Sequence, residues 1–351
     1  MPWLRIATLL LGLGLFGWVL WQTDLDQVGT AMAQIGLVGA LAVAAVYLTA
    51  FLVDTQCWQL AVPSAPLGPT WFYRLWKVRM VGEAFNVTLP STMGGEPVKA
   101  VLLKRHFGIG YKESGSSLVI AKTVNLWTVL LYAGIGLTAM GIDDVLTEGT
   151  RTAAWLGLGV LGICTAGFFA VQRWRMASRL GHLLGRWRYF RALDAVLNKI
   201  DAVENYFHDF YADRPARFAG ALVLSFTNWC LGMLEIWVVL HFLGSPVAIY
   251  EAWMIGTLIE LVRAGTFFIP ASLGAAEVTF VVMAEALTGQ GAIGLAVALV
   301  RRARELVWIA WGLSLGWAFS VTPSPTMTTA APPPTTPPPV APAKSREPEQ
   351  S

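Results

Sequence analysis

Long apolar runs separated by short charged segments constrain this chain more than any other feature. A bilayer core about 30 Å thick is crossed by roughly 20 residues of helix. Runs of that length recur through the sequence, and 13% of its 351 residues are charged while 55% are hydrophobic. Ordinary soluble domains carry about a quarter charged residues. The sequence therefore predicts an all-α, polytopic membrane protein and excludes a typical soluble enzyme.

The apolar runs divide into two kinds, those expected to form complete spans and those that are interrupted. The expected spans are residues 3–21, 37–60, 115–140, 153–172, 216–243, 252–269 and 306–321. Two further stretches, 84–103 and 271–300, contain proline, glycine and charges, which favours broken or re-entrant helices. We therefore expect about seven spans and two broken segments within residues 1–322. Residues 323–351, rich in Pro and Thr, are expected to form a disordered tail.

The charges of the connecting segments predict on which side of the membrane each segment lies. Residues 22–36 carry acidic residues and no Lys or Arg, and 141–152 are also mainly acidic, so both are expected to be outward-facing loops. Residues 173–217 instead hold nine basic residues against five acidic ones, and 63–112 are also basic. The positive-inside rule then places the N-terminus, 63–112 and 173–217 in the cytoplasm. The crossing count places the tail outside, in the periplasm.

An amphipathic helix is expected within the basic segment 173–217. Apolar residues recur there every three or four positions from Trp187 to Phe210. Such a helix either lies on the anionic membrane surface or packs against the protein, and the pattern does not separate the two.

Several short patterns match functional motifs but lack the context that those motifs require. Gly12 to Gly17 and Gly157 to Gly162 match GxGxxG, but both lie inside expected membrane helices, where small residues serve helix packing. The three cysteines and four histidines show no metal-ligand or disulfide spacing. A net charge of +3 is too small to indicate nucleic acid. We expect no catalytic motif, no metal and no cofactor.

Two segments 180 positions apart resemble each other, Leu89 to Glu96 and Ile269 to Glu277. Each reads apolar residue, proline, three residues, glycine and then glutamate. Proline ends a helix and glycine lets the backbone turn, so helix breaks are expected at Pro90, Gly94, Gly95, Pro270 and Gly274. Paired broken helices in corresponding halves indicate a transporter site. The alternative is a pair of loops with a chance match. The crossing count puts both prolines on one side, which suits a parallel repeat, whereas an inverted repeat would require one of the expected boundaries to be wrong.

Ionisable residues inside apolar segments are costly and usually face a cavity. Glu235, Glu260 and Arg263 are the hardest to place in contact with lipid, and we hypothesise that Arg263 recognises an anion while Glu260 orients it. Lys122 either contributes to a site or extends to the cytoplasmic interface. The cluster from Arg301 to Glu305 either lies in the bundle or forms a short cytoplasmic loop.

The motifs carry a family resemblance. Asn86-Val-Thr-Leu-Pro90, followed by Gly95-Glu96-Pro-Val-Lys99 and Lys104-Arg105, resembles the signature of the lysylphosphatidylglycerol-synthase transmembrane family, also called flippase-like membrane proteins. The segment from Ile269 to Glu277 resembles the later Pro-Gly-Glu segment of that family. Residues 301–308 are similar to its hopanoid-biosynthesis-associated branch. The resemblance covers roughly residues 5–320 and implies a multi-helix membrane domain that handles lipids, with Glu96, Lys99 and Glu277 as shared polar positions.

The chain departs from the family pattern in two ways. The family commonly has a Glu-Arg pair near the start of the next helix, whereas this chain has Ala121-Lys122 and Asn125. The synthases also carry a soluble aminoacyl-transfer domain after the membrane part, where this sequence has the tail. We therefore do not expect lysyl transfer to lipid from this chain alone.

The sequence and the resemblance together favour a lipid transporter or flippase-like protein of a bacterial inner membrane, acting on a phospholipid or hopanoid-type lipid. The candidate ligand-binding residues are Glu96, Lys99, Lys122, Glu260, Arg263, Glu277 and Arg301. Membrane lipids are the expected partners, with no nucleic acid. Two alternatives remain at this point: a scaffold or accessory subunit bound to lipid-biosynthesis enzymes, and a membrane-embedded lipid-modifying enzyme, which would need paired acid and base groups.

Overall fold

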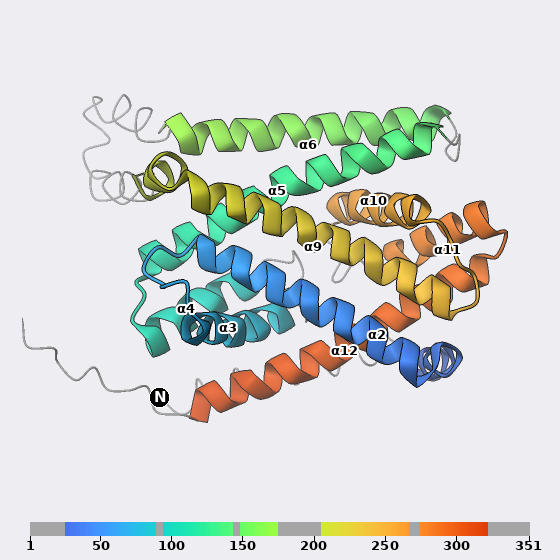
Figure 1. Ribbon diagram of the computed structural model, residues 1–351, viewed down its shortest axis with the longest axis horizontal. Helices are drawn as coiled ribbons and strands as arrows, with labels where there is room; N and C mark the ends of the chain where they lie inside the picture. The colour runs from blue at the N-terminus through green and yellow to red at the C-terminus, as the bar shows by residue number, and fades with distance from the viewer. Residues whose placement is uncertain (1–24, 89–93, 143–147, 175–204, 267–273, 322–351) are drawn as a thin grey trace, which may run out of the picture.

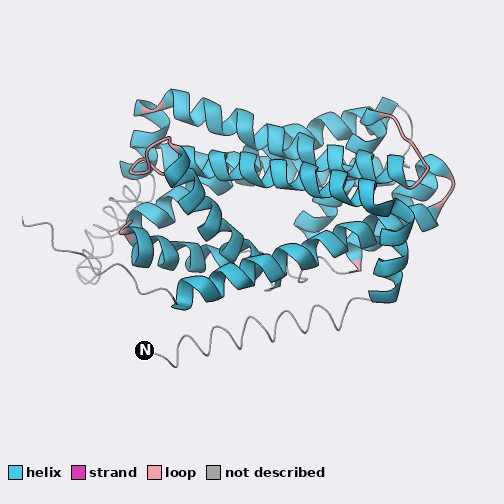
Figure 2. Ribbon diagram, turned by 60° about the horizontal axis from the view of Figure 1, so that its bottom comes forward, coloured by secondary structure: helices cyan, strands magenta, loops and turns pink. Residues whose placement is uncertain are grey.

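The computed structural model describes residues 25–88, 94–142, 148–174, 205–266 and 274–321. Regular structure within these ranges is helical, as Figure 1 and the turned view of Figure 2 show. The labelled helices are α2 (Leu25–Leu60), α3 (Pro69–Thr88), α4 (Gly95–Phe107), α5 (Tyr111–Ile142), α6 (Glu148–Trp174), α9 (Pro215–Phe242), α10 (Ile249–Gly265), α11 (Ala275–Thr288) and α12 (Gly291–Val321).

The prediction of an all-α polytopic membrane protein is confirmed. Within the described ranges, four helical segments are long and apolar enough to cross a membrane, namely Val28–Leu60, Tyr111–Gly141, Arg151–Arg173 and Pro215–Phe242. The total of about seven spans stays a prediction, because residues 1–24, with the expected span 3–21, and the tail lie outside the described residues.

The expected loop at 22–36 is wrong for its described part. Helix α2 already begins at Leu25, and the chain changes direction at Gly36, where φ is +69°. A side chain is disfavoured at that φ, so glycine permits a kink in which helix continues on both sides. Asp26, one of the acidic residues that suggested a loop, thus belongs to the first turn of a helix.

Two helical hairpins stand where the sequence shows its repeated motif. Helix α3 ends at Thr88 and α4 begins at Gly95, while α10 ends at Gly265 and α11 begins at Ala275. The two helices of each hairpin pack against each other. Pro90 and Pro270 themselves lie outside the described residues. The expected span at 252–269 is corrected: α10 has 17 residues, about 25 Å and at the short limit for a membrane span, and it packs against α11 as one side of a hairpin.

The two halves of the bundle form an inverted repeat. The first residues of α3 and α10, of α4 and α11, and of α5 and α12 each lie 180 positions apart. In Figure 1, α5 and α12 run in opposite directions, as do α2 and α9, and the two hairpins enter from opposite ends. The parallel repeat suggested by the crossing count is therefore wrong. That count treated 252–269 as a complete crossing, which placed every later segment on the opposite side.

The position of the end of α12 also differs from what the crossing count predicts. Phe319 lies against His106 of α4, with 4.8 Å between the ring centroids, and packs on a cluster that includes Ala61 and Ala221. The last described turn of α12 therefore lies at the same end of the bundle as the start of α9. The crossing count instead put the tail and residues 173–217 on opposite sides.

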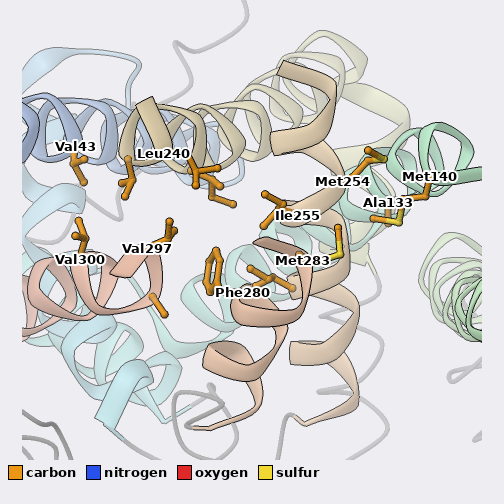
Figure 3. Close-up of a cluster of buried hydrophobic side chains, with 14 of the residues drawn as sticks. Val43, Ala133, Met140, Leu240, Met254, Ile255, Phe280, Met283, Val297 and Val300 are labelled. Atoms are coloured by element: carbon orange, nitrogen blue, oxygen red, sulfur yellow. The ribbon is translucent and has the colours of Figure 1, made fainter. Parts of the chain in front are cut away.

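Each hairpin packs into its own hydrophobic core cluster. One cluster joins α10, α11 and α12 to α2, α5 and α9, and Figure 3 shows Val43, Leu240, Phe280 and Val297 pointing toward one another there. The other joins α3 and α4 to the start of α5, the start of α9 and the helical residues 205–213. Each hairpin is thus held by packing, as short helices in proteins generally are.

Residues 205–213 are the described part of the expected amphipathic helix. Phe207, Phe210 and Tyr211 are buried, and the Tyr206 hydroxyl donates to the carbonyl oxygen of Ala61 at 3.0 Å. This part packs against the protein. Residues 186–204 lie outside the described residues.

Of the glycine pattern in α6, only Gly162 lies near a neighbouring helix, with its Cβ position 4.0 Å from Leu130 of α5. A Cβ atom placed on Gly157 or Gly159 would meet nothing within 4 Å. Helix α6 lies at the edge of the bundle (Figure 1), and large apolar side chains such as Trp155 and Ile163 are exposed. Close contacts occur instead in the hairpin α3–α4, where a Cβ on Gly95 would collide with the carbonyl oxygen of Gly82.

Candidate functional site

Eight charged side chains from four helices form one connected network of ion pairs, which we call the eight-residue network. Four are arginines and four are glutamates, and seven N–O contacts of 2.7–3.8 Å join them. The members are Glu235 of α9, Glu260 and Arg263 of α10, Glu277 of α11, and Arg301, Arg302, Arg304 and Glu305 of α12. With all eight groups ionised, the network has no net charge.

The contribution of α12 comes from its middle. Arg301 to Glu305 begin ten residues after Gly291 in one continuous helix, so they lie about 15 Å from its start. The alternative of a short cytoplasmic loop is therefore wrong for these residues. The expected break within 271–300 corresponds to the end of α11 at Thr288, and the expected span 306–321 is the second half of a 31-residue helix.

The network joins α12 to α9 through a deeply buried pair. Arg304 Nη1 donates to Glu235 Oε2 at 3.0 Å, and the two side chains are 7% and 2% exposed. The guanidinium carbon of Arg304 also lies 3.5 Å from the centroid of the Tyr47 ring of α2, a cation–π contact. Arg301 lies farther from the same carboxylate, with Nε 3.8 Å from Oε2. Glu235 is thus surrounded by cations on one side of α12.

The network joins α12 to the second hairpin through both of its helices. Arg302 donates to Glu277 Oε1 and to Glu305 Oε2, each at 2.7 Å. Arg263, near the end of α10, lies 3.7 Å from both Glu260 and Glu305. The hairpin tip, where α10 ends and α11 begins, is therefore fixed to α12 by charge as well as by packing.

The first turn of α11 places Glu277 for this contact. Gly274 precedes the helix with φ +81°, a conformation that favours glycine. Its N–H donates to Glu277 Oε2 at 2.8 Å, which leaves Oε1 for Arg302. An acidic side chain in the first turn is also favoured by the helix dipole.

A smaller network lies at the tip of the first hairpin. Glu96 Oε1 of α4 is 3.0 Å from Lys99 Nζ and 3.4 Å from Lys122 Nζ of α5. Asn86 of α3 donates to the same oxygen at 3.3 Å and accepts from the N–H of Gly95 at 2.8 Å. Lys99 is buried, whereas the Lys122 side chain is 45% exposed. Lys122 therefore pairs with the hairpin tip, although its side chain is far from enclosed.

The two networks correspond through the repeat. Lys122 and Arg302 lie 180 positions apart, and each binds a glutamate in the first turn of the hairpin helix before it. The same offset relates Asn125 to Glu305. The motif similarity seen in the sequence thus marks two equivalent ion pairs at the two hairpin tips.

Side chains of α2 and α3 lie between the two networks. Arg79 of α3 pairs with Asp54 of α2 and lies over the Phe51 ring, 5.0 Å from its centroid. Tyr47 of α2 lies under the guanidinium group of Arg304. Helix α2 therefore contacts an arginine of α3 through Asp54 and an arginine of the eight-residue network through Tyr47.

The structure brings the sequence-predicted residues into two groups. Glu96, Lys99 and Lys122 meet at one hairpin tip, and Glu260, Arg263, Glu277 and Arg301 belong to the eight-residue network. The Asp54–Arg79 pair and Tyr47 were missed. A charge inside an apolar helix was the available signal for Asp54, since it lies six residues before the end of α2.

Two hollows lie at opposite ends of the bundle, away from both networks. One of about 290 Å³ is lined by Asp26, Thr30 and Gln34 of α2 and by the first turns of α12. The other, of about 400 Å³, is lined by Ser64, Glu113, Tyr206, Asp209 and Arg214 among others. Among the described residues, no group of three His, Cys, Asp or Glu side chains is arranged to hold a metal ion.

Comparison with known proteins gives one match. The family model described as the lysylphosphatidylglycerol synthase TM region matches residues 5–312. No curated protein and no solved structure matches the chain. The matched residues include both hairpins and the whole eight-residue network. Since the match covers most of the 351 residues, the chain belongs to the lysylphosphatidylglycerol synthase TM region family.

Proposed function

We propose that this protein moves phospholipids between the leaflets of a bacterial inner membrane. The observation that carries the proposal is the eight-residue network, which gathers four arginines and four glutamates inside a membrane bundle at the tip of a broken helical hairpin. Charges at that depth are costly, and proteins keep them where a polar substrate passes. A lipid head group would enter the charged layer while its acyl chains stay in the bilayer.

The inverted repeat supports the same proposal. In secondary transporters, two halves of opposite orientation place broken helices near the middle of the membrane, and access alternates between them. Here the hairpins α3–α4 and α10–α11 enter from opposite ends, and each has an ion pair at its tip. The head group would then pass from one tip to the other through the polar side chains between them.

The charge distribution fixes the orientation that we propose. The basic segment 63–112 and residues 205–217, the described end of the basic segment 173–217, lie at the same end of the bundle, because both pack in one core cluster. The positive-inside rule assigns this end to the cytoplasm. The end of α12 then faces the cytoplasm as well, and the loop between α9 and α10 faces the periplasm.

Cysteine labelling in intact cells tests this orientation. With the native cysteines replaced by alanine, Ala248→Cys is expected to react with a membrane-impermeant maleimide that reaches the periplasm. Thr70→Cys is expected to react only after the inner membrane is permeabilised. Both positions are exposed and lie at opposite ends of the bundle. Labelling of Thr70→Cys in intact cells, with protection of Ala248→Cys, would show the reverse orientation.

Reconstituted vesicles test the transport itself. The purified protein is expected to equilibrate acyl-chain-labelled phospholipids between leaflets, as measured by dithionite quenching of the inner-leaflet label over time. Arg263→Ala is expected to slow this exchange by about tenfold or more, because it removes the cation that ties the tip of α10 to Glu305. Arg263→Lys keeps the charge and is expected to keep part of the rate.

Lys112→Gln is the matched control, since Lys112 is exposed in the first turn of α5 and belongs to neither network. It should exchange lipid at the wild-type rate. Folding of each variant is checked by its thermal midpoint in detergent. If vesicles with the wild-type protein exchange lipid no faster than protein-free vesicles, the transport proposal is wrong, and a scaffold for lipid-biosynthesis enzymes becomes the better interpretation.

A further inference from the structure

The eight-residue network is joined without a closed ring. Its seven contacts link eight groups in a branched chain. Breaking any one contact therefore divides the network into two separate parts. A substrate inserted at one of these contacts would face both parts, so their charges would decide which substrate fits.

The contact between Arg304 and Glu305 divides the network into parts of opposite charge. On one side are Glu235, Arg301 and Arg304, which together have a net charge of +1. On the other side are Glu260, Arg263, Glu277, Arg302 and Glu305, which together have a net charge of −1. Arg304 Nη2 and Glu305 Oε1 are 3.7 Å apart, beyond hydrogen-bond distance. It is one of four contacts of 3.7–3.8 Å in the network, and among these four it alone separates a cationic part of several residues from an anionic part of several residues.

The cationic part also holds unpartnered polar atoms. Among the described residues, Nε of Arg301, Nε of Arg304 and Oε1 of Glu235 are buried without a hydrogen-bond partner, and their side chains are 11%, 7% and 2% exposed. In the anionic part, Nε of Arg263 likewise has no partner among these residues. Buried polar groups are normally paired, so such exceptions call for an explanation. Two guanidinium groups with free Nε–H donors suit a phosphate, which accepts paired hydrogen bonds from arginine.

Resting on the proposed transport function, we infer that the substrate head group is a zwitterion with one phosphate and one ammonium group. The phosphate binds Arg301 and Arg304, and the ammonium group binds the carboxylates on the other side of the Arg304–Glu305 contact. Inserted there, it offsets the +1 and the −1 part together. A head group with a net charge would leave that charge uncompensated among buried groups, which is costly.

Exchange rates for three head groups test this inference. Vesicles contain acyl-chain-labelled lipid with a phosphoethanolamine head group (no net charge), a phosphoglycerol head group (net −1), or a head group with one phosphate and two ammonium groups (net +1). The wild-type protein is expected to exchange the phosphoethanolamine lipid about tenfold faster than either charged lipid. Equal rates for the three lipids, or a faster rate for either charged one, would overturn the inference while leaving the transport proposal in place.

A change of network charge provides the second arm. Glu305→Gln gives the network a net charge of +1 and is expected to shift the preference toward the phosphoglycerol lipid. Glu260→Gln makes the same change at a terminal member of the network, 20% exposed, and serves if Glu305→Gln does not fold. Lys112→Gln should leave the ratio of the rates unchanged. An unchanged ratio in a folded Glu260→Gln protein contradicts the inference, whereas the absence of any exchange by the wild type contradicts the proposed function as well.

Discussion

Replacing Glu235 by glutamine is expected to lower the free energy of unfolding by about 3–5 kcal/mol. The carboxylate is 2% exposed and is the ion-pair partner of both Arg301 and Arg304. Glutamine keeps the shape but removes the ion-pair partner of Arg301 and the closer of the two partners of Arg304, which keeps only the 3.7 Å contact with Glu305. A large loss therefore comes from the uncompensated charges and only in part from the lost contact. Thermal unfolding in detergent, followed by the apparent midpoint, measures the effect.

The same substitution at Glu148 is the matched control. Its side chain is 94% exposed and pairs with Arg151 at 3.8 Å, so Glu148→Gln should change stability by no more than about 0.5 kcal/mol. Adding Arg304→Met to Glu235→Gln removes one of the two charges that lose this partner and should recover part of the loss. If Glu235→Gln costs as little as Glu148→Gln, the Glu235 carboxylate is not the counter-charge of these arginines.

The second large effect is expected at the tip of the first hairpin, from Gly95→Ala. A Cβ at this position would collide with the carbonyl oxygen of Gly82 and lie 2.9 Å from Asn86 Oδ1. Both obstacles are held in place, one as backbone and the other by the N–H of Gly95. The hairpin must open to admit the methyl group, and overpacking of this kind costs about 1–3 kcal/mol. The thermal midpoint should fall accordingly.

Gly115→Ala tests whether the effect belongs to the contact. Gly115 lies inside α5, and a Cβ there would meet nothing within 4 Å. Alanine is favoured over glycine in a helix interior by about 1 kcal/mol, so this variant should be as stable as the wild type or more stable. Equal midpoints for Gly95→Ala and Gly115→Ala would mean that α3 and α4 do not approach as closely as described.

The fold was predictable where one-dimensional signals suffice. Hydropathy identified α5, α6 and α9 to within a few residues, because burial in a bilayer depends on length and composition. It failed for 252–269, where an apolar segment of nearly spanning length forms one side of a hairpin. Apolar sequence is common to complete spans and to buried hairpins, so hydropathy alone does not distinguish them. That one error also changed the predicted relation between the halves.

The site was predictable as a set of costly charges, although their partners were not. Glu260 and Arg263 were paired from their spacing of one helical turn, and the structure has them 3.7 Å apart. No sequence pattern indicated that Arg304 would meet Glu235, 69 positions away on another helix. Which helical faces meet is decided by packing between helices, and a single sequence contains no record of those contacts.

The inverted repeat has a consequence for vectorial movement. Rotating the bundle by half a turn about an axis in the membrane plane exchanges the two hairpins. The arrangement of the hairpin backbones therefore does not distinguish the two directions across the membrane. A preference for one direction of transport must therefore come from side chains that differ between the two halves. Arg302 binds two carboxylates and is 7% exposed, whereas Lys122 is 45% exposed, and Asn125 stands where the other half has Glu305. Under the proposed function, any bias toward one leaflet would therefore depend on a handful of side chains on α5 and α12.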